Sequence, residues 1–243
     1  MTPTPHASGA LWIPESRTIL IADAHLGYGW AQRRRGELGP VRDLQSREKL
    51  AALLEELSPQ EVVFLGDLVH APRPADQERA FIEETLRYIA KLAPITIVRG
   101  NHDRAFARDF PNLGLTIIEE WRAGNLVAIH GDRPYIAQPN ETVIAGHLHP
   151  SLSIEDAAGV KLRVRVFLIG DGLIILPAFS PFAAGLDLSR GLSPKLQQLL
   201  KNRKIQAVAA TGKRTLLLGP LERFAGASPT QRYDPTLRRR KPY

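Results

Sequence analysis

Cysteine is absent from this sequence of 243 residues. Its absence excludes disulfide bonds, thiolate zinc sites and a cysteine nucleophile, and it fits a reducing compartment. Long apolar runs are missing too, because stretches such as Gly172–Pro177 are far shorter than the ~20 residues that span a bilayer. Residues Met1–Gly9 lack the positive start and apolar run of a signal peptide. We therefore expect a cytoplasmic protein without membrane contact.

Acidic side chains are fewer than basic ones, 25 against 32, which gives a formal charge of +7 at pH 7. Arginine dominates the basic residues, and its planar guanidinium suits bidentate binding of phosphate. Part of the excess lies at the C-terminus, in Arg238–Lys241. Such a basic segment can bind nucleic acid or can simply be solvated. The charge thus indicates an anionic partner and leaves nucleic acid open.

The first two-thirds of the sequence alternates short apolar runs with amphipathic stretches. Leucines recur at helical spacing in a segment that begins near Asp43, and a second amphipathic segment begins near Ala75. Three apolar runs flank them, and we predict strands at residues 18–22, 61–65 and 95–98. Strands that alternate with helices are typical of a parallel α/β sheet.

Beyond about Thr116 short strand-like runs follow one another with little helix between them. They cover residues 115–118, 126–129, 143–145, 161–169, 173–176, 205–209 and 215–218, with a helix at 194–202. The turn at Gly170–Gly172 predicts a hairpin. We expect a second, mixed or antiparallel sheet packed on the first, in a single domain over residues 1–219. Residues 220–243 are poor in aliphatic side chains and predict a basic, flexible tail.

Six of the seven histidines come just after predicted strands, and most have Asp or Asn close by. The motifs are Asp23-Ala-His25, Gly66-Asp67-Leu-Val-His70, Gly100-Asn101-His102-Asp103, His130-Gly-Asp132 and Gly146-His147-Leu-His149. Loops at the carboxyl ends of strands in an open α/β sheet converge on one crevice. Residues far apart in the sequence are therefore expected to meet there.

The side chains of these motifs are oxygen and nitrogen donors, which suit first-row divalent ions. On an extended segment, residues i and i+2 share a face, so Asp23 and His25 can point at one ion, as can His147 and His149. Glycines next to the candidate ligands allow sharp turns close to an ion. One such motif occurs often by chance, but five in order at strand ends indicate a metal site.

The sequence resembles the calcineurin-like metallophosphoesterase superfamily over about residues 17–180. The resemblance lies in the order and approximate spacing of Asp23-Ala-His25, Gly66-Asp67, Gly100-Asn-His-Asp103, His130 and Gly146-His-Leu-His149. The resemblance implies an α/β fold of two packed mixed β-sheets flanked by helices, a four-layer α/β/β/α arrangement. Asp23-Ala-His-Leu-Gly27, Arg33–Gly36 and Leu176–Pro181 further resemble a narrower branch. That branch comprises bacterial metallophosphoesterases associated with DNA ligase and a helicase in DNA repair.

The resemblance also implies roles for individual residues. Two divalent metal ions are expected, Mn²⁺ first, with Fe or another first-row metal as alternatives. The first ion would be bound by Asp23, His25 and His149, the second by Asn101, His130 and His147, with Asp67 bridging both. The catalytic residues would be His102, which donates a hydrogen bond or proton to the leaving oxygen, and Asp103, which orients its ring.

Contacts to substrate are less clearly marked in the sequence. Arg33, Arg34 and Arg35 follow the first metal motif closely enough to reach a phosphate, although a solvated loop explains them equally well. His70 is predicted either to contact substrate or a metal ligand, or to be a surface imidazole.

A two-metal phosphoesterase acting on phosphodiesters or phosphomonoesters in nucleic acid or nucleotides, with a role in DNA repair, is the favoured function. The resemblance adds DNA ligase and helicase as partners, while the oligomeric state is not indicated. A broad phosphatase for small metabolites is the alternative enzyme. A non-catalytic scaffold with this fold is disfavoured because such a relative would be expected to lose His102 or several ligands.

Overall fold

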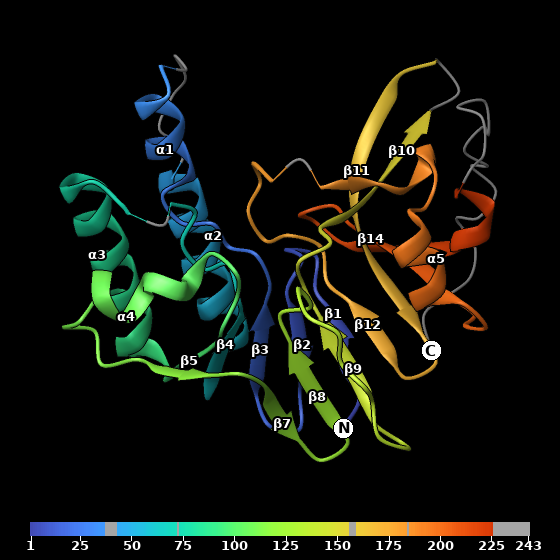
Figure 1. The fold of residues 1–243 in the computed structure, drawn as a ribbon, viewed down its shortest axis with the longest axis horizontal. Coiled ribbons are helices and arrows are strands. Elements are labelled where there is room, and N and C mark those ends of the chain that lie inside the picture. The colour runs from blue at the N-terminus through green and yellow to red at the C-terminus, as the bar shows by residue number, and fades with distance from the viewer. Residues whose placement is uncertain (37–42, 72, 156–158, 184, 226–243) are drawn as a thin grey trace.

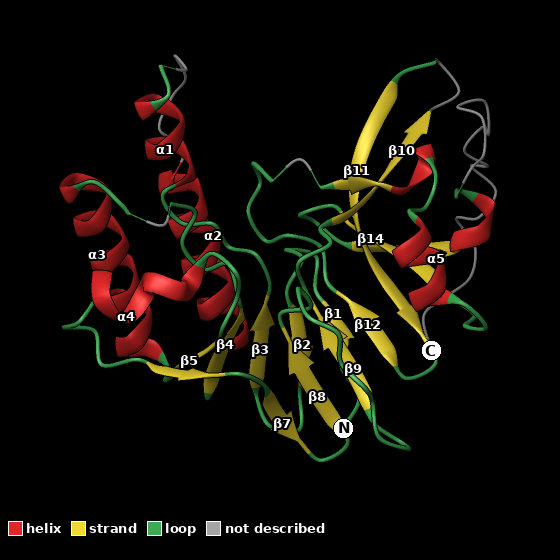
Figure 2. Cartoon of the chain, viewed as in Figure 1, coloured by secondary structure: helices red, strands yellow, loops and turns green. Residues whose placement is uncertain are grey.

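Two β-sheets face each other, and helices cover the outer side of each sheet (Figure 1). This arrangement is seen in a computed structural model that describes residues 1–36, 43–71, 73–155, 159–183 and 185–225. Figure 2 shows that most of the helices lie on one side of the molecule and most of the strands on the other. No helix within these ranges combines the length and the apolar character needed to cross a membrane.

The first sheet has six strands, which are neighbours in sequence order. They are β1 (Thr4–Pro5), β2 (Leu11–Ile13), β3 (Thr18–Ile21), β4 (Glu61–Leu65), β5 (Ile95–Val98) and β6 (Thr116–Ile118). Strands β3 to β6 are parallel, and β1 and β2 extend the sheet as an antiparallel edge. The helices on this side are α1 (Tyr28–Arg34), α2 (Asp43–Leu57), α3 (Asp76–Leu92) and the short α4 (Phe106–Asp109).

The second sheet is mixed and has nine strands. They are β7 (Trp121–Ala123), β8 (Leu126–Ile129), β9 (Thr142–Ala145), β10 (Pro150–Glu155), β11 (Lys161–Gly170), β12 (Leu173–Ile175), β13 (Leu186–Asp187), β14 (Gln206–Ala210) and β15 (Thr215–Pro220). Strands β8, β9 and β12 run parallel, and β11 pairs antiparallel with β10, β12 and β14. Helix α5 (Pro194–Leu200) covers its outer face.

Alternation along the buried strands produces the layers. Phe64 of β4 packs toward the helices, whereas Val63 and Leu65 pack toward the second sheet. The layer between the sheets is completed by Phe167 and Ile174 of the second sheet. Because successive side chains of a strand point to opposite faces, a strand buried on both faces is apolar throughout. The predicted four-layer α/β fold is confirmed.

Several element predictions need correction. The predicted strand at 115–118 belongs to the first sheet as β6, not to the second, because it pairs in parallel with β5. Helix α1 and the edge strands β1, β7 and β13 were not anticipated, since each is too short to show a hydrophobic period. The hairpin at Gly170–Gly172 is confirmed by the pairing of β11 with β12.

The packed part of the chain continues past residue 219, where the sequence predicted the domain to end. Leu221 is 3% exposed and packs in the core around α5, with Phe224 against it. Residues 220–225 are therefore part of the fold, contrary to the expectation that the tail starts at Pro220. Residues 226–243 lie outside the described ranges, and the tail stays a prediction.

Candidate metal centre

The candidate ligands follow the carboxyl ends of strands from both sheets. Asp23 comes after β3, Asp67 after β4 and Asn101 after β5 of the first sheet, while His130 and His147 follow β8 and β9 of the second. The parallel direction of these strands within each sheet places all five loops at one edge. The predicted convergence thus arises from both sheets together.

Asp23, His25 and His149 form one group whose possible ligand atoms lie within 4.8 Å of one another. Asp23 is fully buried, and its Oδ1 lies 3.1 Å from Nε2 of His149. Burial disfavours the charged form of His149, but the hydrogen bond and charge of Asp23 outweigh it and raise its pKa. His25 is also buried, and its Nδ1 has no hydrogen-bond partner among the described residues.

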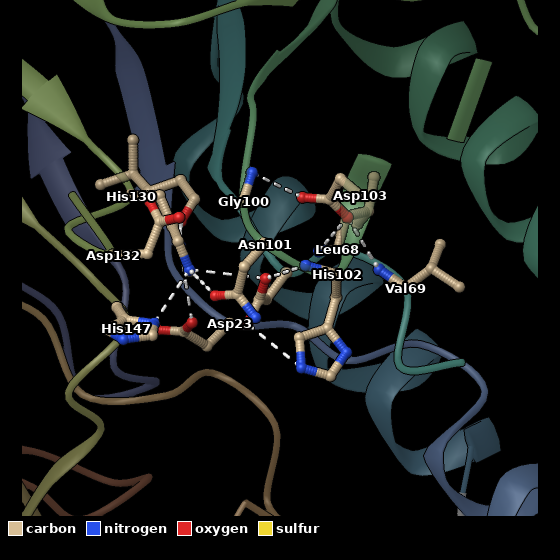
Figure 3. A network of polar contacts seen from close by, with 12 residues as sticks. Asp23, Leu68, Val69, Gly100, Asn101, His102, Asp103, His130, Asp132 and His147 are labelled. Atoms are coloured by element: carbon tan, nitrogen blue, oxygen red, sulfur yellow. Dashed lines mark hydrogen bonds and ion pairs between the residues drawn. The ribbon is translucent and has the colours of Figure 1, made fainter. Parts of the chain in front are cut away.

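Asp67, His130 and His147 form the second group within the same 4.8 Å limit. Nδ1 of His130 lies 2.9 Å from the backbone oxygen of Leu65. A carbonyl oxygen only accepts, so Nδ1 carries the hydrogen and Nε2 of the neutral ring has a free lone pair. Figure 3 shows this Nε2 directed toward Asn101 and His147.

Lone pairs therefore converge at the second group. Nε2 of His130 lies 3.1 Å from Oδ1 of Asn101, 3.4 Å from Oδ1 of Asp67 and 3.1 Å from Nδ1 of His147. The two oxygens are acceptors and would repel the bare nitrogen unless a cation lies between them. Together with the unpartnered Nδ1 of His25, this donor set fits two divalent ions.

The backbone at the candidate ligands is unusual. Five of the seven have a positive φ: Asp23 54°, His25 44°, Asp67 47°, His147 64° and His149 45°. Non-glycine residues rarely adopt this left-handed conformation, which costs roughly 1–2 kcal/mol per residue. The sequence argument that Asp23 and His25 share a face of an extended segment is therefore wrong in its geometry, although the side chains do converge. Such strain concentrates at functional sites.

Glycines allow the ligand loops to pack against one another. A Cβ on Gly66, whose φ is 74°, would overlap the ring of His130. A Cβ on Gly146 would lie 2.7 Å from Cβ of Ala22 and 2.8 Å from Oδ2 of Asp23. These residues therefore bring the backbone close to the ligands, as the sequence predicted.

Asp103 does not contact the ring of His102, contrary to the role expected from the resemblance. Its Oδ1 accepts from the backbone N–H of Leu68 at 3.0 Å, and its Oδ2 from that of Gly100 at 3.0 Å (Figure 3). Burial and then the nearby Asp67 charge raise the pKa of Asp103 to about 6. The carboxyl group thus joins the two loops that carry Asp67 and Asn101.

The ring of His102 is held instead by the backbone of the β4 loop. Its Nδ1 lies 2.9 Å from the carbonyl oxygen of His70, and its Nε2 lies 3.9 Å from Oδ2 of Asp67. About a third of the side chain, 35%, is exposed. Nε2 therefore faces the space beside the metal groups, where a leaving oxygen could accept its proton.

A cavity of about 300 Å³ opens over both groups. It is lined by His25, Tyr28, Asp67, His70, Asn101, His102, His147, His149 and Ala183. Burial, followed by the neighbouring imidazoles, lowers the pKa of His25 to about 2. Burial, then His102, Arg35 and Arg34, lowers the pKa of His70 to about 4. Both rings are therefore neutral at pH 7, the form in which imidazole binds metals.

The sequence model of the calcineurin-like phosphoesterase family matches residues 16–166, which contain every candidate ligand. The chain belongs to the calcineurin-like phosphoesterase family. In fold it is similar to the crystal structure of the Pseudomonas putida nuclease MPE, with a TM-score of 0.66 and 24% identity. The alignment covers 89% of this chain and 99% of that chain, and at this identity it supports the fold alone. No curated protein sequence matches at a significant level.

In this calcineurin-like chain the arginines lie beside the cavity but do not line it. Arg34 donates to the backbone oxygen of Arg73 at 2.9 Å and pairs with Glu78, which is fully buried, at 3.2 Å. It therefore ties α1 to α3. Arg33 and Arg35 are exposed at the end of α1. His70, by contrast, does line the cavity.

Two cavity-lining residues of this phosphoesterase were missed from the sequence. Tyr28 is the first residue of α1, three positions after His25, and Ala183 lies in the loop after β12. Tyr28 could have been suspected because it is a large aromatic residue only three positions after the first metal motif. Nothing in the local pattern marks Ala183, since its position depends on how the loop folds back over the site.

Proposed function

We propose that the chain is a two-metal phosphoesterase that hydrolyses phosphodiester bonds in nucleic acid. The observation that carries the proposal is the convergence of two donor groups and of His102 on one cavity. The net charge of +7 favours a polyanionic substrate. The similarly folded protein from Pseudomonas putida is named a nuclease, which adds support for nucleic acid.

The ligand assignment follows the two donor groups. Asp23, His25 and His149 would hold the first ion, and Asn101, His130 and His147 the second. Asp67, whose Oδ1 lies 3.4 Å from Nε2 of His130 in the second group, would bridge the two ions, as the resemblance implies. Mn²⁺ is proposed first, since mixed oxygen and nitrogen donors suit it and other first-row ions. When bound, the ions would activate a water and neutralise charge on the phosphate.

His102 would deliver the proton in this reaction. The carbonyl of His70 fixes the hydrogen on Nδ1, so a protonated ring presents its second N–H at Nε2 toward the cavity. That N–H can protonate the oxygen that leaves phosphorus. Asp103 would act indirectly. Its carboxylate accepts hydrogen bonds from backbone N–H groups and so holds in place the two loops that carry Asp67 and Asn101.

A role in DNA repair beside a ligase and a helicase is the finer part of the proposal. It rests on the resemblance of Asp23–Gly27, Arg33–Gly36 and Leu176–Pro181 to the ligase-associated branch. The likeness to the nuclease covers nearly the whole chain, which is compatible with a similar nucleic-acid substrate.

A substrate panel tests the proposed function. Protein loaded with Mn²⁺ would be assayed with bis-p-nitrophenyl phosphate, p-nitrophenyl phosphate, 2′,3′-cyclic nucleotides and end-labelled DNA and RNA. EDTA is the control for every substrate, and His102→Ala is the control for the polynucleotides. We expect metal-dependent cleavage of the diesters and of at least one polynucleotide. Cleavage of the monoester alone would indicate a metabolite phosphatase. Full metal content without any turnover would indicate a scaffold.

A further inference from the structure

A row of aromatic rings leads out of the cavity from His102. The rings of His102 and His70 are stacked, with centroids 6.0 Å apart and planes 22° apart. Tyr28 follows at 4.5 Å from His70, and Phe182 stacks on Tyr28 at 5.8 Å and 22°. Tyr28 and Phe182 are both partly exposed, and Tyr28 lines the cavity. The metal groups and the proposed proton donor make no use of these two rings.

Phe182 is carried by a loop that is anchored through its backbone. Nζ of Lys49 donates to the carbonyl oxygen of Phe179 at 2.7 Å. Arg165 donates to the same oxygen and to that of Ala178, both at 3.1 Å. Two cations from α2 and β11 therefore fix the segment just before Phe182.

Tyr28 is the first residue of α1, and this helix is anchored at both ends. The backbone N–H of Gly29 donates to Oδ1 of the buried Asp43 at 3.4 Å. At the other end of this helix Arg34 pairs with Glu78. The two rings thus come from separate, anchored segments and meet at the edge of the cavity. A pre-formed pair of this kind can bind a flat group with little loss of side-chain entropy.

We propose that Tyr28 and Phe182 form a stacking subsite for the nucleobase attached to the nucleotide whose phosphate lies at the metal groups. The subsite rests on the proposed function, because the phosphate must lie beside His102 for the base to reach Tyr28. One sugar joins a phosphate to its base, and one ring, His70, separates His102 from Tyr28. Stacking on aromatic side chains accepts every base, since each base has a π-face. The subsite therefore selects for a base beside the phosphate, not for a particular sequence.

A binding measurement that needs no turnover tests the subsite. The probe is a short single-stranded oligonucleotide with 2-aminopurine next to a non-hydrolysable methylenephosphonate linkage, added to Mn²⁺-loaded protein. Stacking on Tyr28 should quench the fluorescence of 2-aminopurine. Tyr28→Ala and Phe182→Ala should each weaken binding roughly 5- to 150-fold and reduce the quenching, the usual range for one lost base–aromatic stack. Tyr28→Phe and Phe182→Tyr, which keep the rings, should retain both.

Cleavage of an ordinary oligonucleotide gives the second readout. The alanine variants should raise KM and keep kcat, and on an oligonucleotide with an abasic site at the stacked position they should match the wild type. Equal losses on the abasic and normal substrates, or unchanged binding and quenching, would overturn the subsite. A different result would contradict the proposed function and leave the subsite in place: the wild type would bind the probe and quench its fluorescence but cleave no phosphodiester.

Discussion

Nδ1 of His102 donates its hydrogen to the backbone oxygen of His70 across 2.9 Å. The partner is a carbonyl group, so it can only accept, and it remains in place whatever side chain residue 70 carries. The ring orientation of the proposed proton donor is therefore built into the backbone of the loop that also carries Asp67.

Replacement of His102 by alanine should lower kcat for polynucleotides by about 10²–10⁴-fold, the usual contribution of a positioned acid. Metal content should stay unchanged, since His102 belongs to neither donor group. The loss should be much smaller with bis-p-nitrophenyl phosphate, whose leaving group needs little protonation. His70→Ala is the matched variant, because it keeps the carbonyl, and its kcat should fall far less. Equal kcat losses in the two variants would contradict the assigned role.

Substitution of Asp67 by alanine should remove both metal ions together. The side chain is buried and lies against His130, and it also receives the backbone N–H of His102 at 2.9 Å. Metal-to-protein ratios by plasma mass spectrometry after gel filtration measure the effect. Asp132→Asn serves as the control, since Asp132 belongs to neither donor group, and it should keep both ions. Retention of two ions by Asp67→Ala would exclude the bridging role.

Asp103→Asn should reduce stability more than it reduces catalysis. The amide nitrogen of asparagine would face a backbone N–H, either that of Leu68 or that of Gly100, and would leave one buried donor unpaired. An unsatisfied buried group costs about 1–3 kcal/mol. Denaturant unfolding measures this loss, and kcat below the transition should fall less than in His102→Ala. A variant as stable as the wild type but as inactive as His102→Ala would restore a direct catalytic role.

The sequence predicts the identity of the ligands better than their geometry. Asp23 and His25 could be found because strand ends, glycines and donor types coincide along the chain. Their left-handed backbone could not, since it arises from packing of loops from two sheets around one point. The partner of His102 was missed for a related reason: a carbonyl oxygen belongs to every residue, so no sequence pattern marks the one at His70.

The fold shows the same contrast. Strands β3, β4 and β5 could be predicted because each is a buried apolar run between turn residues. The place of β6 could not, because Thr116–Ile118 carries no mark of the sheet it will join. Pairing with β5 decides it, and that contact is made only in the folded chain.

Because of Lys49, the free energy of unfolding should change with pH in the alkaline range. Burial lowers its pKa well below 10.5, so between the folded-state pKa and 10.5 the unfolded chain binds more protons than the folded one. Stability contributed by this group therefore rises with pH through that window. Lys49→Met removes the titrating group and keeps the length of the side chain. Urea unfolding of the metal-free proteins at several pH values should show a stability difference, wild type minus variant, that increases with pH. A constant difference would mean that Lys49 titrates normally.

Truncation after Ala225 should separate nucleic-acid affinity from chemistry. A cut at Pro220 would remove Leu221 from the core, so the later cut is the cleaner test of the basic segment Arg238–Lys241. If these cations contact phosphates, their loss weakens polynucleotide binding and flattens the dependence of log K on log salt by roughly 0.7–0.9 for each lost contact. Hydrolysis of bis-p-nitrophenyl phosphate should be unchanged, because the metal groups lie within residues 23–149. Arg238→Gln, Arg239→Gln, Arg240→Gln and Lys241→Gln combined in the full chain form the matched control. An unchanged salt slope in both proteins would show that the segment does not bind nucleic acid.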